Sequence, residues 1–257
     1  GSAPTGGARR RGASGPGGAA GVGAPKSPGP VLGESAPAVA TLLRQAAGLY
    51  KHAAVGILPA LKEGLPGERP AELLASMAET MRLVCLAEAQ AATARRAEEK
   101  GTALPLLCKL HMGAYELYKA ADQTLGDHVS DFNFISRKLQ AYILLGVSVH
   151  HARAHRAAAA EAAEANDIGE AIASCDAAVK HLAKAAGAAG ETEAWRTAAE
   201  EERDTLAALR GRFVRENEVV FFEKVPEKPA KKLPEGKVIV AEIDPVARVQ
   251  LQNLFVE

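Results

Sequence analysis

Histidine and cysteine are the residues of this sequence whose types and spacing could do chemistry. His151 and His155 are one helical turn apart, and His150 stands beside them. A zinc site needs three or four ligands, and the next turn of that face offers no carboxylate or cysteine. We therefore expect these histidines to form a polar helix face, and we predict no metal site and no cofactor.

A second pair, Cys108 and His111, has the three-residue spacing at which an imidazole could activate a thiol. No third residue that would orient the imidazole is recognisable, and no oxyanion loop is either. The sequence also has no glycine-rich phosphate loop and no GxSxG or HExxH pattern. We predict no catalytic residues and a protein that is not an enzyme.

Leucine is the better candidate for a functional side chain. The segment 104–110 has more apolar residues than one buried helical stripe needs, namely Leu104, Leu106, Leu107 and Leu110. Burying one leucine is worth roughly 1.5–3 kcal/mol, so two or three exposed leucines on a concave surface could hold a partner helix at micromolar affinity. The alternative is that all four face the core of a purely structural scaffold.

Helices must position these side chains. Residues 83–118 contain two helices broken at Gly101-Thr102, because apolar residues recur at three- and four-residue spacing on either side. Frequent alanines let neighbouring helices approach closely. Similar periodicity predicts helices at 37–62 (kinked or ended by Pro59), 70–100, 102–126, 132–165, 166–186 and 192–218.

Capping and turn residues mark the ends of these elements. Thr102 is the expected N-cap of the third helix, and Asn166 or Asp167 caps the fifth. A turn at 187–190 (GAAG) separates the fifth helix from the sixth. Residues 219–225 (VVFFEKV) are β-branched and aromatic and are stopped by a proline, so we expect an extended arm laid against the helices.

The predicted fold class is all-α. We expect an elongated antiparallel helical bundle with a tetratricopeptide-like central part, ending in an extended C-terminal arm; a short helical solenoid is the alternative. Residues 1–34 form a low-complexity basic tail that we expect to be disordered, although an organelle transit peptide has the same composition. Residues 35–226 form the helical domain, and residues 227–257 form a Pro- and Lys-rich arm.

Composition narrows the classes of partner. The 257 residues include 31 basic and 31 acidic side chains and only 4% aromatics, so neither the net charge nor stacking platforms indicate a nucleic-acid partner. Cys85, Cys108 and Cys175 have no metal-like spacing, which predicts buried thiols in a reducing compartment. No apolar run approaches the roughly 18 residues of a membrane helix, and no secretory signal is visible.

Three stretches carry a family resemblance. They are CLAEAQ at 85–90 continued by Lys109-Leu110 and AYELYKAAD at 114–122, then GEAIASCDAAVKHL at 169–182, then RENEVVFFEKVP at 215–226. In this order they resemble the Bro-one (BRO) domain, the all-helical domain shared by Alix, Brox and their relatives, which act with the ESCRT machinery. The resemblance implies a curved helical domain with a tetratricopeptide-like central part.

The resemblance also implies a function. In this family, a hydrophobic patch on the concave surface binds the amphipathic C-terminal helix of an ESCRT-III subunit, and the match places patch positions at Thr93, Leu106 and Leu110. Thr93 replaces the aromatic residue of the Alix branch and, with the CLAEAQ spelling, looks more like the Brox branch. We expect a non-catalytic ESCRT-associated adaptor in endosomal sorting and membrane remodelling. The alternative is a structural helical-repeat scaffold or incomplete gene product without ESCRT binding.

Two departures from the family pattern shape further expectations. Family members have a sizeable portion before this region, where this chain has the low-complexity tail, so the resemblance implies that 35–226 is a partial Bro-one domain. Brox also ends in a prenylated cysteine, whereas this chain ends QNLFVE, so we expect no direct membrane anchor. We expect a cytoplasmic protein that reaches endosomes through its partners, with an organellar location as the minor alternative.

Overall fold

The structure is a computed structural model that describes residues 1, 35–61, 70–128, 130, 135–190 and 192–244. Apart from Gly1, the predicted tail 1–34 therefore lies outside the described residues, as does the end of the arm from 245. Every regular element in the described ranges is helical, which confirms the all-α prediction. The elements are α1 (Ser35–His52), η1 (Ala53–Ile57), α2 (Leu58–Leu61), η3 (Ala71–Leu73), α3 (Ala75–Glu99), α4 (Leu104–Asp127), α5 (Arg137–Glu164), α6 (Ile168–Ala189), α7 (Glu193–Glu216) and η5 (Asn217–Phe221).

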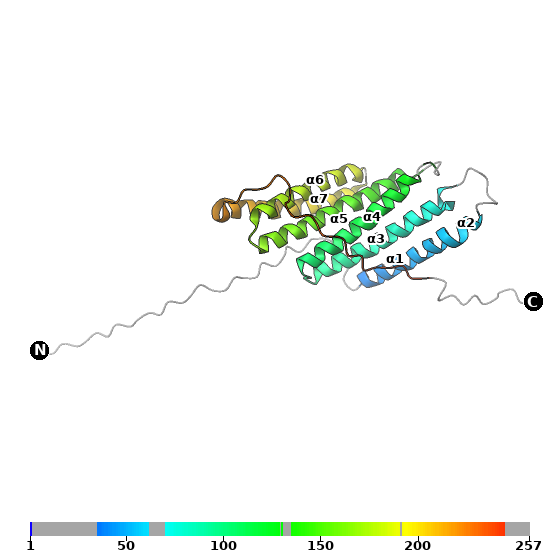
Figure 1. Ribbon diagram of the computed structural model, residues 1–257, viewed down its shortest axis with the longest axis horizontal. Helices are drawn as coiled ribbons and strands as arrows, with labels where there is room; N and C mark the ends of the chain where they lie inside the picture. Colours follow the sequence, from blue (N-terminus) through cyan, green and yellow to red (C-terminus); the bar gives the residue numbers. More distant parts are fainter. Residues whose placement is uncertain (2–34, 62–69, 129, 131–134, 191, 245–257) are drawn as a thin grey trace, which may run out of the picture.

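The long helices form an elongated antiparallel row (Figure 1). Helix α1 packs on α3, α3 on α4, α4 on α5, α5 on α6, and α6 on α7. Each helix thus buries its apolar stripe against the next one along the chain, and short connections suffice between antiparallel neighbours. Within the described part of the chain, no helix is long and apolar enough to cross a lipid bilayer.

Alanine and leucine build the core that holds α5, α6 and α7 together. Ile172, Cys175 and Leu182 on α6 pack with Leu206 and Phe213 on α7. These positions recur at helical spacing, and the apolar side chains of α7 were expected from the same pattern. The N-cap of α6 is Asp167, whose carboxylate accepts a hydrogen bond from the Glu170 amide at 3.3 Å. This confirms one of the two predicted caps.

Proline sets the form of the first helix. Pro59 has no amide hydrogen, and its ring would clash with the carbonyl four residues earlier in a regular helix. The chain relieves this clash by widening into the π turn η1 before it continues as α2. The disturbance expected from Pro59 therefore falls just before the proline, and the helical segment runs on to Leu61.

The structure corrects two predicted helix ends. Thr102 is not the N-cap of α4, because Ala103 occupies that position and Pro105 takes the first turn, where its fixed φ angle is favourable. The expected turn at 187–190 is also wrong, since α6 continues through Gly187 to Ala189. Gly190 alone takes the positive φ of 56° that ends the helix.

The segment that follows α7 begins with a turn, and the extended arm starts only after this turn. Residues 217–221 form the π turn η5, so the extended run begins later than predicted. Asn217 causes this, because its side-chain amide donates to the Glu223 carbonyl at 2.9 Å and its oxygen accepts from the Glu223 amide at 2.8 Å. Phe222 closes the turn in the left-handed region, with a φ of 54°.

From Glu223 the chain is extended and crosses one face of the bundle, and we call residues 223–244 the strap. Figure 1 shows it in brown, running from the end of α7 across the helices toward α1. Glu170 on α6 accepts hydrogen bonds from the amides of Ala230 at 2.8 Å and Lys231 at 3.0 Å. At the other end, Arg44 on α1 donates to the Ala241 carbonyl at 2.7 Å. The extended C-terminal arm predicted from residue 227 is thus seen as far as residue 244, whereas the arm predicted at 219–225 begins as a turn.

Candidate partner-binding surface

A buried glutamine on α3 organises the candidate surface. The amide nitrogen of Gln90 donates to the Leu110 carbonyl on α4 at 3.1 Å and to the Lys237 carbonyl in the strap at 2.8 Å. Its amide oxygen accepts from the Ile239 amide at 3.0 Å. Gln90 has no exposed surface, so one fully satisfied side chain fixes two helices and the strap relative to each other.

Close approach of the strap to α4 depends on a glycine. A Cβ atom at Gly113 would lie 2.7 Å from the Lys237 carbonyl oxygen, which is backbone and cannot rotate away. The Lys237 amide donates to the Lys109 carbonyl at 2.8 Å, and the Gly236 amide donates to the Glu116 carboxylate, also at 2.8 Å. The strap is therefore seated directly on the surface of α4 beside the candidate patch.

The three residues predicted for partner binding lie on neighbouring turns of the α3–α4 hairpin. Because the two helices are antiparallel, Thr93 and Leu106 each lie about one turn from the Gln90–Leu110 contact, toward the loop that joins the helices. Leu106 is 36% exposed, Thr93 is half-buried, and Leu110 is only 3% exposed. We call these three residues the α3–α4 patch, with Leu106 at the surface and Leu110 beneath it.

The strap adds apolar surface that the sequence reasoning missed. Val238 and Ile239 flank the contact with Gln90, and their side chains are 43% and 51% exposed. The available signal was the β-branched run at 238–240, which alternates neither with charges nor with glycines. It was assigned to an extended segment, but a sequence pattern does not state which helices such a segment will cross.

A tyrosine pair joins three helices within the bundle. The hydroxyls of Tyr118 on α4 and Tyr142 on α5 both donate to the Glu88 carboxylate on α3. Burial raises the pKa of Tyr118 well above its usual value, and the charge of Glu88 raises it further, so the hydroxyl stays a donor. This network links α3, α4 and α5, and it holds Glu88 in a partly buried setting.

The pair Cys108 and His111 does not form an activated thiol. Cys108 packs with Met112 and Ala154, whereas the His111 ring lies within the bundle with its Nδ1 atom 3.2 Å from the Nδ1 atom of His150. Burial raises the pKa of Cys108 to about 11. The thiol is therefore protonated and unreactive at neutral pH.

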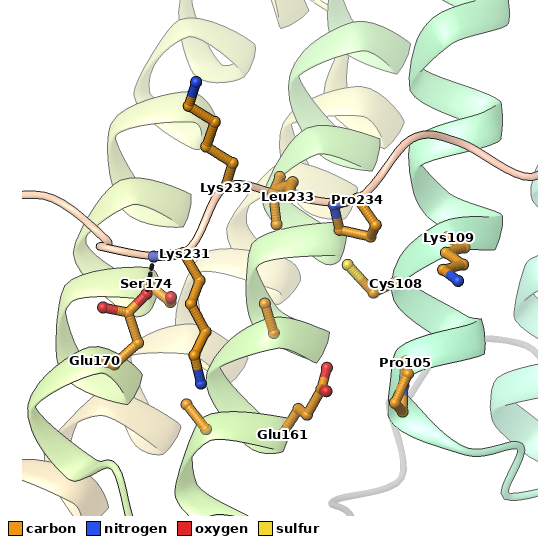
Figure 2. A pocket seen from close by; sticks show the side chains of 12 residues that line it. Pro105, Cys108, Lys109, Glu161, Glu170, Ser174, Lys231, Lys232, Leu233 and Pro234 are labelled. Carbon is orange, nitrogen blue, oxygen red and sulfur yellow. Dashed lines mark hydrogen bonds between the residues drawn. The ribbon is translucent and has the colours of Figure 1, made fainter.

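A pocket of about 330 Å³ lies between the strap and helices α4–α6, close to Cys108 (Figure 2). Its carboxylate Glu170 is already engaged by strap amides. The remaining side chains at its mouth include Glu161 and Lys231, which form no recognisable catalytic arrangement. All three cysteines are buried and unpaired, as the sequence predicted.

The histidines of α5 are not the polar helix face that the sequence predicted. His150 and His155 are buried, because α5 lies between α4 and α6 and has no fully solvated side at these turns. His150 faces the α4 side and lies near His111 and Tyr118. His151 and His155 instead meet His181 of α6.

Fold and surface together define a class of protein. The described part of the bundle is all-helical, its last described segment is a strap, and Leu106 is exposed on the helical hairpin beside that strap. These features are typical of a protein-interaction domain, since helix faces of this kind bind amphipathic partner helices. The model of the BRO1-like domain matches residues 34–256, and the chain belongs to this family.

Solved structures share the fold at low sequence identity. ALIX in complex with the SIVmac239 PYKEVTEDL late domain has 15% identity and a TM-score of 0.71, covering 87% of this chain and 30% of that chain. The ALIX BRO1 CHMP4C complex has 18% identity and a TM-score of 0.70, and the match covers 87% of this chain and 59% of that chain. A structure reported as the basis for endosomal targeting by the Bro1 domain has 16% identity and a TM-score of 0.59, and the match covers 76% of this chain and 55% of that chain.

This chain thus spans between about one third and three fifths of the length of those structures. A search of curated proteins found no match.

Proposed function

We propose that this chain is a non-catalytic, ESCRT-associated adaptor that binds the amphipathic C-terminal helix of an ESCRT-III subunit through the α3–α4 patch. Membership of the BRO1-like family supports the proposal, as does the shared fold with an ALIX BRO1 domain that was solved in complex with CHMP4C. The observation that carries it is the exposed Leu106 on the hairpin that Gln90 joins to the strap.

The expected mode of binding is a helix in a shallow groove. A micromolar complex requires about −8 kcal/mol, and burying a whole leucine contributes roughly 1.5–3 kcal/mol. Leu106 is already partly covered, so it supplies only a fraction of this free energy. Val238 and Ile239 provide further apolar surface close by, and the buried Leu110 lies one helical turn from Leu106. The partner helix would therefore contact both the hairpin and the strap.

Thr93 is the basis for placing this chain in a Brox-like branch, which is the second part of the proposal. Its hydroxyl donates to the Ala89 carbonyl at 2.8 Å within α3, so it brings no unsatisfied polar atom to the patch. It also offers much less apolar area than the aromatic residue of the Alix branch. We therefore expect weaker binding than in that branch, and a role at endosomal membranes that depends on partners.

A purely structural scaffold without ESCRT binding is the alternative function. The burial of Leu110 favours it, because a leucine with 3% exposure contributes to the core of the hairpin whether or not a partner binds. The two functions differ in what happens at Leu106, whose side chain has no comparable structural role.

Backbone hydrogen exchange distinguishes the adaptor from the structural scaffold. The chain is incubated with an excess of an ESCRT-III C-terminal helix peptide, and the exchange of its backbone amides is compared with that of the free chain. The adaptor proposal expects slower exchange at the facing ends of α3 and α4 and in the strap near 237–240, with α7 unchanged. Exchange that is identical in the two samples, or protection confined to α6 and α7, contradicts it.

A further inference from the structure

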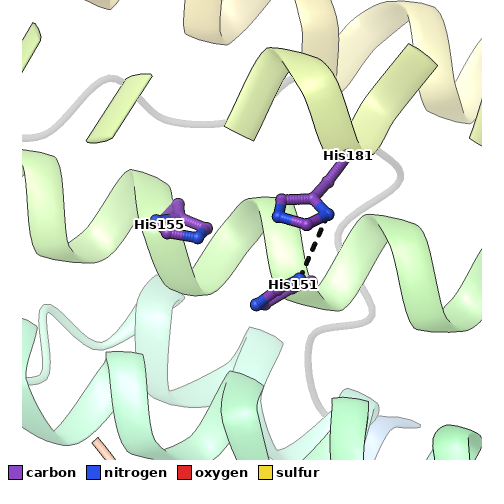
Figure 3. Close-up of side chains that lie close together, drawn as sticks. All are labelled: His151, His155 and His181. Carbon is purple, nitrogen blue, oxygen red and sulfur yellow. Dashed lines mark hydrogen bonds between the residues drawn. The ribbon is translucent and has the colours of Figure 1, made fainter. Parts of the chain in front are cut away.

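Three histidines from two helices converge beside the strap. His151 and His155 are one turn apart on α5, and His181 approaches them from α6 (Figure 3). One ring nitrogen of each lies within 4.8 Å of those of the other two. The sequence offered only the pair on α5, because His181 is 26 positions beyond His155 and the pairing of α5 with α6 was needed to bring it close.

The spacing is close to that of a tetrahedral metal site. Ligand nitrogens about 2.0–2.1 Å from zinc lie roughly 3.3 Å apart when the angles are tetrahedral. The Nδ1 atoms of His151 and His181 are already 3.2 Å apart. The His155 ring is stacked on His181 with 5.5 Å between centroids, so a modest rotation of one side chain would complete a three-nitrogen set.

His155 also carries an unexplained polar atom. Its Nδ1 is buried and has no hydrogen-bond partner, a condition shared by only two other buried side-chain atoms among the described residues. Buried polar atoms are nearly always satisfied, and such an exception calls for an explanation. Coordination of a metal ion by Nδ1, after the side-chain rotation described above, would satisfy this nitrogen.

The protonation state suits metal binding. Burial lowers the pKa of His151 to about 3, with a further contribution from His181, and burial likewise lowers the pKa of His155 to about 4. Burial also lowers the pKa of His181. These shifts favour the neutral imidazole, which is the form that ligates metals. A bound ion would replace the hydrogen bond that joins the Nδ1 atoms of His151 and His181.

We propose that His151, His155 and His181 form a binding site for a divalent transition-metal ion of the zinc type. An all-imidazole set favours zinc and its neighbours over magnesium and calcium, which prefer oxygen ligands. The bound ion would join α5 to α6 and so stabilise the centre of the helical row. This site is separate from the α3–α4 patch and does not depend on the adaptor function.

The neighbouring pocket contains one candidate for a fourth ligand. His155 and His181 line a pocket of about 470 Å³ that also contains Glu227 of the strap, together with Lys180, Lys184 and Lys228. These lysines oppose a dication, so an anionic fourth ligand is needed to offset their charge. Among the described residues that line this pocket, Glu227 is the acidic one. It is exposed and is not part of the three-histidine group, so it would have to turn toward the ion to link the metal to the strap.

The test uses untagged full-length chain freed of metal by a chelator and titrated with Co²⁺, which reports tetrahedral coordination through its visible absorption. We expect an absorption that saturates at one equivalent and is displaced by Zn²⁺. The melting temperature should also rise by several degrees with excess Zn²⁺ because the ion binds only the folded state. Absence of both effects overturns the proposal.

The matched variants are His181→Gln and, as a control on an exposed face, His52→Gln. His181 is half-buried, so its replacement is expected to leave the helical circular dichroism unchanged. Loss of a ligand should weaken Zn²⁺ binding by more than the roughly 10–100-fold that loss of an outer-shell partner costs. Binding that is equal in a folded His181→Gln variant and the parent chain overturns the assignment of the site.

Discussion

The side-chain amide of Gln90 donates a hydrogen bond to the main-chain carbonyl of Lys237, 147 positions further along the chain, at 2.8 Å. This bond makes the strap part of the same surface as the α3–α4 hairpin. The patch that the sequence located on two helices is consequently bordered by a third segment. Its shape depends on the glutamine as well as on the leucines.

Replacing Gln90 by leucine tests this relationship. The volume is nearly kept, but the Lys237 carbonyl and the Ile239 amide lose their partner, and the Leu110 carbonyl, which lies inside α4, loses its additional donor. An unsatisfied buried group costs about 1–3 kcal/mol, so we expect a loss of at least that size in urea unfolding. Trypsin should also cleave sooner at the lysines of the strap. Gln140→Leu on α5 is the control, and equal cleavage in the two variants would show that Gln90 does not hold the strap.

Two glycines of the helices should respond in opposite ways to alanine. Gly113→Ala places a methyl group 2.7 Å from the Lys237 carbonyl oxygen, so we expect displacement of the strap and destabilisation of about 1–3 kcal/mol. The methyl group added by Gly187→Ala has no atom within 4 Å, and the residue lies in the last turn of α6. This variant should stabilise the folded chain by about 0.4–1 kcal/mol. Thermal unfolding measures both changes, and a stabilising Gly113→Ala would contradict the described contact.

A buried carboxylate joins α5 to α7. Glu202 accepts from Arg153 at 2.9 Å and from Arg156 at 2.6 Å, and Arg156 also pairs with Glu98 at 2.9 Å. The Glu202→Gln variant leaves Arg156 with Glu98 as its remaining counter-ion and leaves Arg153, which is partly exposed, without Glu202. We therefore expect a loss below the roughly 3–5 kcal/mol of a fully unpaired buried charge, about 1–3 kcal/mol. The neighbouring exposed carboxylate provides the control, since Glu201→Gln should change stability by less than about 0.5 kcal/mol. Urea unfolding of the two variants measures both losses of stability, and equal losses would contradict the role of Glu202.

Lowering the pH from about 6.5 toward 3 should destabilise the fold, because two buried histidines stay neutral in the folded chain. Burial lowers the pKa of His150 to about 3 and that of His111 well below its usual value, with nearby arginine charge adding to both effects. Unfolded histidines titrate near about 6.5, so between that pH and about 3 the unfolded chain binds protons that the folded chain refuses. Stability is therefore complete above pH ~6.5 and falls as the pH drops, by up to about 1.4 kcal/mol per pH unit for each of these two histidines. Urea unfolding at pH 7, 6 and 5 measures the slope, and equal stabilities would contradict the buried neutral pair.

The helices could be predicted from the sequence because their signals are local. Apolar spacing and the cap at Asp167 depend on residues within a few turns, and they located the long helices to within a few positions. The exceptions arise where competing local preferences are close in energy, as at Thr102 and Pro105. The π turn after α7 was missed because it depends on a side-chain contact between Asn217 and Glu223 rather than on propensity.

The candidate surface could be predicted only in part. Thr93, Leu106 and Leu110 follow from the family resemblance, whereas their different exposures depend on packing that no spacing rule gives. Ile239 lies 149 positions from Gln90, and His181 lies on a different helix from His151. Such long-range pairings require the topology of the helices and the path of the strap.

The most direct test of the central claim is a fluorescence-anisotropy titration of a labelled ESCRT-III C-terminal helix peptide with the full chain. Leu106→Asp is the test variant, and Leu144→Asp, which alters a leucine of α5 with 43% exposure, is the matched control. Leu110→Asp is unsuitable because a charge at that buried position should destabilise the hairpin. The account predicts saturable micromolar binding that is retained in Leu144→Asp and lost in a folded Leu106→Asp variant. No binding by the folded parent chain, or equal binding by both variants, would contradict it.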